Sequence, residues 1–349
     1  MSCTTTTATG GASALGLSIG QFCNSSEYAA KITPGQIVTR KVQKVQPERN
    51  CTIEQARASL KANGYNGKMS SRTRANVVGM LAEWFTVKKA ERGRAFSKDN
   101  SVARRFTFCT LTLCAPQMHS DNYLKRHALG RFIQECERHH GVKDYFWRAE
   151  PQNNGNIHFH LLLSTEIPWR KVRDHWNRIL ADLGYLEIYT HKMYNMYCGG
   201  FKVSNNQYDK RSKEQQYKAY LAGVKCKWSD PNSIDIHRLE KTKNAAAYVC
   251  KYVSKDEGSR KIEGRIWGCS DSLRALKTPQ FEVTAEFLQA MQQAAASGQI
   301  ELMQLEHVAV YRGDVPALLA ALFPQLLIEL EQHYRDKLAE LRNFSRAAT

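Results

Sequence analysis

Two histidines separated by one residue, His158 and His160, are the positions at which this sequence most clearly offers metal ligands. They lie in an apolar run, residues 157–163, whose composition is typical of a β-strand. Because side chains alternate between the two faces of a strand, both imidazoles point to the same face, with Phe159 and Leu161 toward the core. Two imidazoles on one face can chelate a single cation.

The residues before this strand predict a partner strand in a hairpin. Residues 144–150 have strand composition, and the connection 151–156 contains Asn-Gly, a strong hairpin signal. A turn centred near residues 153–154 places Glu150 opposite His158 and Arg148 opposite His160. Directly opposite residues share a face, with Cβ atoms about 5 Å apart.

This register brings two imidazole nitrogens and one carboxylate oxygen to one point. Glu150 is therefore the expected third ligand, although Gln152 lies close in sequence. The remaining coordination positions stay open. A mixed nitrogen and oxygen site with open positions suits Mg²⁺ or Mn²⁺, and Zn²⁺ remains an alternative. The competing interpretation is two surface histidines beside a glutamate.

A second group of reactive side chains falls in a predicted helix over residues 243–255. At 100° per residue, two tyrosines and two lysines occupy one stripe of about 100°, opposite an apolar side. These residues are Tyr248, Lys251, Tyr252 and Lys255. A phenol oxygen can attack phosphorus when its negative charge is stabilised by nearby lysines and a metal. The alternative is a solvated amphipathic face.

The elements that must position these residues alternate between strands and helices. Strands are predicted at 106–113, at the hairpin and at 185–189, and helices at 121–140 and 169–183. Residues 192–235 have no clear pattern. A helical pair begins near Thr52 and Ser71, after a loosely ordered start, and residues 284–344 are predicted to be helical. This order favours an α+β fold with a central antiparallel sheet, flanking helices, and helical N- and C-terminal extensions.

The charge distribution favours a nucleic-acid partner. The chain of 349 residues carries a net charge of +17, yet the residues from Phe281 onward sum to −4, so the rest is strongly basic. Simple solubility is the alternative. We find no secretory signal, membrane span, P-loop or Cys-x-x-Cys pattern, which favours a reducing cytoplasm and no membrane partner.

Three blocks in this order resemble the HUH endonucleases. They are Thr110-Leu-Thr112, the His158-Phe-His160 strand, and the Tyr-x-x-Lys-Tyr-x-x-Lys helix at 248–255. The paired tyrosines are similar to the two-tyrosine class, the rolling-circle replication initiators of small single-stranded DNA phages and related replicons. The resemblance covers roughly residues 104–256. It implies an antiparallel sheet with the histidine strand at its centre and the tyrosine helix beside it.

The resemblance also implies roles for individual residues. His158, His160 and Glu150 would bind the metal, Mg²⁺ or Mn²⁺. Tyr248 and Tyr252 would be the nucleophiles, and the two lysines Lys251 and Lys255 would steady the phosphate. Thr110 and Thr112 would lie in the sheet near the metal strand.

The implied activity is nicking and rejoining of single-stranded origin DNA through a 5′-phosphotyrosine intermediate. A host polymerase would extend the free 3′ end. No helicase domain is visible, so a host helicase would unwind the DNA. The expected location is the host cytoplasm. Trp147 and Trp228 offer surfaces for base stacking, with core packing as the alternative.

The expected organisation has three parts. Residues 1–100 form a helical and partly flexible region, 101–280 the endonuclease domain, and 281–349 an acidic helical region whose leucine stripe, Leu318 to Leu330, is more often core than interface. Other functions remain open: a relaxase or transposase of the HUH type, a non-catalytic DNA-binding regulator, or a metal-dependent hydrolase that acts through water.

Overall fold

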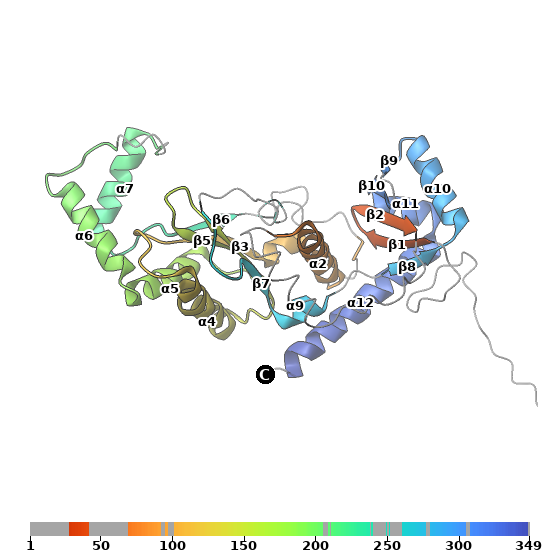
Figure 1. The fold of residues 1–349 in the computed structure, drawn as a ribbon, viewed down its shortest axis with the longest axis horizontal. Helices are drawn as coiled ribbons and strands as arrows, with labels where there is room; N and C mark the ends of the chain where they lie inside the picture. The colour runs from red at the N-terminus through yellow and green to blue at the C-terminus, as the bar shows by residue number, and fades with distance from the viewer. Residues whose placement is uncertain are drawn as a thin grey trace, which may run out of the picture. The chain divides into compact units, whose positions relative to one another are not determined.

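The structure is a computed structural model. It describes residues 28–41, 69–91, 95–96, 101–204, 209, 211–237, 239, 249, 251, 260–276, 280–304 and 308–347. The chain divides into two compact units, and each contains one five-stranded antiparallel sheet (Figure 1). The fold class is therefore α+β, as the sequence predicts.

The larger unit comprises the described parts of Tyr65–Val78 and Asn100–Ala275. Its sheet has the order β6-β3-β5-β4-β7. The strands are β3 (Thr107–Thr112), β4 (Tyr145–Pro151), β5 (Ile157–Leu163), β6 (Ile234–His237) and β7 (Trp267–Cys269). The histidine strand β5 lies at the centre, which is the position that the resemblance implies.

Helices cover the face of this sheet that lies opposite the histidines. The predicted helix over 121–140 is α3 (Asp121–Leu124), a π-helical turn η2 (Lys125–Leu129) and α4 (Gly130–His140), and α5 spans Trp169–Asp182. Trp176 of α5 packs edge-on against Phe159 of β5 and Phe132 of α4, with ring centroids 6.4 and 5.9 Å apart. All three rings are fully buried, so they join both helices to the sheet.

The predicted strand at 185–189 is wrong, because these residues begin helix α6 (Tyr185–Tyr197). Gly184, with φ of 81°, separates α5 from α6. The Tyr185 hydroxyl accepts hydrogen bonds from the backbone nitrogens of Met118 and His119. A buried tertiary contact thus holds a strand-like sequence as a helix.

The stretch 192–235, which has no clear pattern in the sequence, contains a second helix, α7 (Lys213–Lys225). Ser212 begins it with a capping box: its side chain accepts from the Gln215 backbone nitrogen, and the Gln215 side chain accepts from the Ser212 nitrogen. The unit also contains the short helices η1 (Ser101–Arg105) and α9 (Asp271–Ala275).

The smaller unit comprises the described parts of Met1–Gly64, Gly79–Asp99 and Leu276–Thr349. Its sheet has the order β8-β1-β2-β10-β9. The strands are β1 (Tyr28–Thr33), β2 (Gln36–Lys41), β8 (Gln280–Val283), β9 (Ile300–Gln304) and β10 (Val308–Gly313). Helices are present on both sides of the sequence, as expected, but the sequence analysis did not predict these strands. The loosely ordered start is wrong for residues 28–41.

Helices α10 (Ala285–Ala296), α11 (Val315–Leu322) and α12 (Pro324–Ala347) complete this unit, together with the Gly79–Ala90 part of α2 (Ser71–Ala90). Glu83 of α2 is fully buried and accepts hydrogen bonds from Tyr334 and Lys337 of α12. The leucine stripe is mostly core: Leu319 and Leu330 are fully buried, whereas Leu322 is exposed.

The helix predicted near Thr52 lies outside the described residues, whereas the one from Ser71 is confirmed as α2. No helix in the part of the chain that the structure describes is long and apolar enough to cross a bilayer.

Candidate metal centre

The β4–β5 hairpin brings the three predicted metal ligands together. Its register pairs Glu150 with His158 and Arg148 with His160, as the sequence predicts. Oε2 of Glu150 lies 3.5 Å from Nε2 of His158 and 3.3 Å from Nε2 of His160. One donor atom from each residue lies within 4.8 Å of the other two. A single ion can therefore contact all three.

The environment favours the protonation states that a metal ligand needs. Burial by itself would raise the pKa of the Glu150 carboxyl, but hydrogen bonds from His158 and His160 outweigh it and lower the pKa to about 2. Burial lowers the pKa of His160. The site thus offers an ionised carboxylate and a neutral imidazole, the forms that bind cations.

Two buried polar atoms support the fit of a divalent cation. Within the described part of the chain, neither Oε1 of Glu150 nor Nδ1 of His158 has a hydrogen-bond partner. A free carboxylate oxygen beside the donor cluster would allow either one-oxygen or two-oxygen coordination by Glu150. The donor set therefore fits a divalent metal ion, and the choice of Mg²⁺ or Mn²⁺ stays a prediction.

A second layer of side chains orients His160. The Thr110 hydroxyl lies 2.9 Å from Nδ1 of His160 and 3.1 Å from Nε2 of His237. Thr110 is directly opposite His160 on β3, and Asp235 on β6 follows on the other side. Contacts of this kind fix the ring orientation and tautomer of a ligating histidine.

The predicted position of both threonines is confirmed, because Thr112 is opposite His158. Its hydroxyl donates to the backbone oxygen of Ser233 and not to an imidazole. Sequence reasoning missed His237. The only local signal is its alternation with Asp235, which does not reveal that β6 pairs with β3.

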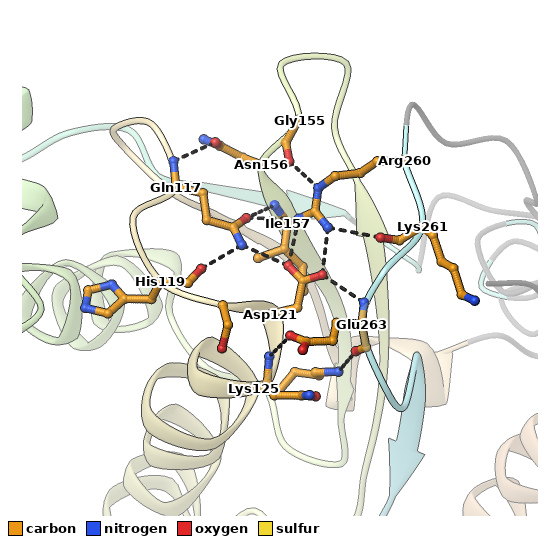
Figure 2. A network of polar contacts seen from close by, with 12 residues as sticks. Gln117, His119, Asp121, Lys125, Gly155, Asn156, Ile157, Arg260, Lys261 and Glu263 are labelled. Atoms are coloured by element: carbon orange, nitrogen blue, oxygen red, sulfur yellow. Dashed lines mark hydrogen bonds and ion pairs between the residues drawn. The ribbon is translucent and has the colours of Figure 1, made fainter. Parts of the chain in front are cut away.

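A polar network surrounds the turn of the hairpin (Figure 2). Arg260 donates to both carboxylate oxygens of Asp121 and to the backbone oxygen of Gly155 in the turn. Gln117 accepts from the backbone nitrogen of Ile157, the first residue of β5. An open pocket of about 590 Å³ lies beside this network, lined by Gln117, Ser120, Asp121, Arg260, Lys261, Glu263 and Gly264.

The expected nucleophiles lie outside the described residues. This holds for Tyr248, Tyr252 and Lys255. Two residues of the segment are described, and both are helical: Val249 is buried and Lys251 is exposed. Their burial agrees with the predicted apolar and polar sides of the helix. The positions of the tyrosines relative to the metal centre remain a prediction.

The two tryptophans considered for base stacking differ in exposure. Trp228 is buried and stacks on Tyr197 with ring centroids 5.0 Å apart, so it belongs to the protein core. Trp147 is partly exposed, on β4 opposite Gly268 of β7.

The fold and the site define an α+β protein with a candidate divalent-metal centre on the central strand of an antiparallel sheet. Residues 106–257 match the model of a family of replication-associated proteins, the ORF2 family. The matched segment contains β3, the β4–β5 hairpin and the predicted tyrosine helix. No curated protein and no solved structure gave a significant match. The family match supports a replication initiator with DNA as its partner.

Proposed function

We propose that the protein is a rolling-circle replication initiator of the HUH two-tyrosine class, which nicks and rejoins single-stranded origin DNA. The observation that carries this proposal is the convergence of Glu150, His158 and His160 within the segment that matches the replication-associated family. The Tyr-x-x-Lys-Tyr-x-x-Lys sequence follows in the same segment.

In this mechanism Glu150, His158 and His160 hold one Mg²⁺ or Mn²⁺. When bound, the ion would polarise the scissile phosphate and offset the charge that develops on its oxygens. Thr110 keeps the His160 ring oriented. Lys251 and Lys255 add positive charge beside the phosphate and favour the phenolate form of the tyrosines.

The covalent step is a transesterification at phosphorus. The phenolate oxygen of Tyr248 or Tyr252 forms a bond to phosphorus, and the bond from phosphorus to the 3′ oxygen breaks. The 3′ oxygen takes a proton from solvent and leaves as a free hydroxyl. One phosphate ester replaces another, so rejoining requires no ATP.

Two tyrosines four residues apart would allow the roles to alternate. One tyrosine holds the 5′ end while a host polymerase extends the 3′ end behind a host helicase. The second tyrosine then cuts the regenerated junction. The released 3′ hydroxyl attacks the first phosphotyrosine and closes the circle, in the cytoplasm of the host.

The test is formation of a covalent protein–DNA species on single-stranded oligonucleotides tiled across the replicon, with Mn²⁺ or Mg²⁺. We expect an adduct that survives SDS, disappears with protease and requires metal. A protein with both Tyr248→Phe and Tyr252→Phe should form none. His158→Ala should remove cleavage yet retain DNA binding. Tyr28→Phe on β1 and His191→Ala on α6 are the matched controls.

Other outcomes would replace the proposal with a specific alternative. Cleavage without an adduct indicates hydrolysis by water. DNA binding without cleavage on any oligonucleotide indicates a regulator. Adducts at a transfer origin or at the end of a mobile element indicate a relaxase or a transposase.

A further inference from the structure

Helices α6 and α7 form a part of the larger unit that the metal centre does not use. We call residues 185–228 the α6–α7 arm. Figure 1 shows the two helices, in green, beyond α5. The arm is rich in both aromatic and basic residues, which is the combination that single-stranded DNA-binding surfaces use.

A cluster of aromatic rings holds the two helices together. Tyr197 of α6 stacks on Trp228 at 5.0 Å with an interplanar angle of 5°, and its ring is also 5.0 Å from Tyr220 of α7. Phe201 packs 5.6 Å from Tyr220. Trp228 is buried. The arm therefore has its own small core and can present a fixed surface.

The outer face of α7 combines apolar side chains with lysines. Tyr217, Leu221 and Val224 are 45, 48 and 49% exposed, although their spacing puts them on one stripe. At 100° per residue, Lys213 and Lys225 fall at the two edges of the same arc of about 120°. An exposed apolar stripe edged by positive charge is unusual for a solvated helix face.

The charge of the arm favours a polyanion over a protein partner. Residues 185–228 contain eight basic and three acidic side chains. Among the residues that the structure describes, no carboxylate pairs with Lys192, Lys202, Lys213, Lys225 or Lys227. Lysine is depleted at the centre of protein interfaces, whereas it contacts phosphates in DNA complexes.

We propose that the outer face of α7 binds single-stranded DNA, with Tyr217 stacking on an unpaired base and Lys213 and Lys225 contacting phosphates. The identity of the ligand rests on the proposed function. The surface lies on other elements than the metal centre, so it holds the strand without taking part in cleavage.

The test measures binding of a fluorescein-labelled oligonucleotide of thirty thymidines by anisotropy, in EDTA so that no cleavage occurs. Tyr217→Ala should weaken binding by about tenfold, because stacking on one aromatic ring contributes about that much. Tyr217→Trp should retain binding. Ile328→Ala, an exposed apolar residue of α12, is the matched control.

The lysines are tested separately, because they are exposed and their loss leaves the aromatic core intact. The double variant Lys213→Gln with Lys225→Gln should reduce the slope of log K against log salt by about 1.4, that is, by two phosphate contacts on a single strand. Lys41→Gln with Arg312→Gln removes the same charge from exposed positions on the other sheet and should leave the slope unchanged.

The proposal is overturned if the wild type does not bind the oligonucleotide, or if Tyr217→Ala and the lysine variant both bind within twofold of wild type. Equal losses on a blunt thirty-base-pair duplex would contradict stacking on unpaired bases. A change in oligomeric state without a change in DNA binding would assign the surface to protein contacts. Because binding is measured without metal, a failure of the adduct assay would not affect this result.

Discussion

Arg260 and Asp121 form a two-point ion pair, in which Nη1 donates to Oδ2 and Nη2 donates to Oδ1, each at 2.7 Å (Figure 2). The same guanidinium donates from Nε to the backbone oxygen of Gly155 at 2.6 Å. Arg260 thus joins the start of α3, the turn of the metal-site hairpin and the segment that leads to β7. Planar guanidinium–carboxylate pairing of this kind fixes geometry as well as energy.

Replacing Arg260 with Gln should destabilise the larger unit by about 2–4 kcal/mol, because Asp121 is buried and would lose its charged partner. Urea unfolding measures the change. Arg274→Gln is the control, since Arg274 and Asp271 form an exposed pair and its loss should cost less than about 1 kcal/mol. Equal effects of the two substitutions would contradict the assigned importance of the buried pair.

The same pair predicts a dependence of stability on pH. Burial alone would raise the pKa of Asp121, but hydrogen bonds from Arg260, Gln117 and the Glu263 backbone nitrogen outweigh it and lower the pKa below its usual value of 3.8. A carboxyl whose pKa is lower in the folded state contributes stability above the unfolded pKa and loses it as pH falls through the folded pKa.

The stability difference between wild type and Asp121→Asn should therefore be largest near pH 6 and shrink as the pH falls below about 4. Urea unfolding at a series of pH values measures this difference directly. The other titrating groups are shared by both proteins and largely cancel in the comparison. A difference that stays constant from pH 6 to pH 3 would contradict the prediction.

Local signals account for the parts of the site that the sequence predicts. The Asn-Gly turn and the strand composition fix the β4–β5 hairpin, and its register places Glu150 opposite His158. The helices over 121–140 and 169–183 also follow from local apolar spacing. These features depend on residues close in sequence, so one chain is enough to find them.

Contacts between distant segments account for what the sequence does not reveal. Strand β1 pairs with β8, about 250 residues later, and no local pattern specifies that partner. His237 reaches Thr110 only because β6 adds to β3. The Arg260 network likewise joins three segments that are separate in sequence. The strand-like residues 185–189 are helical because Tyr185 is buried beneath a loop.

Thr110 offers a test of the second layer around the metal centre. Thr110→Val removes the hydroxyl next to His160 Nδ1 and His237 Nε2 and should weaken Mn²⁺ binding by about 10- to 100-fold. Thr110→Ser should retain most of the affinity. Calorimetric titration with Mn²⁺ measures both. Thr112→Val is the control, because its hydroxyl contacts a backbone oxygen; an equal loss there would argue against orientation of His160 by Thr110.

Gly223 allows Trp228 to pack directly against α7. A Cβ at this position would lie 1.9 Å from Cζ3 and 2.4 Å from Cη2 of the indole, closer than any real contact. Gly223→Ala should therefore displace Trp228, whose backbone already has a positive φ of 59°, and open the aromatic core of the arm. Gly199→Ala, in the same arm, meets no atom within 4 Å.

Hydrogen–deuterium exchange of the α6–α7 arm measures this effect. Gly223→Ala should increase amide exchange in α7 and near Trp228, because the helix loses the packing that protects its hydrogen bonds. Gly199→Ala should leave exchange close to that of the wild type. The strands β3, β4 and β5 should keep their protection in both variants, since their core includes Phe159 and Trp176 but not the arm. If Gly223→Ala leaves α7 as protected as Gly199→Ala does, the ring of Trp228 does not pack against Gly223 in solution.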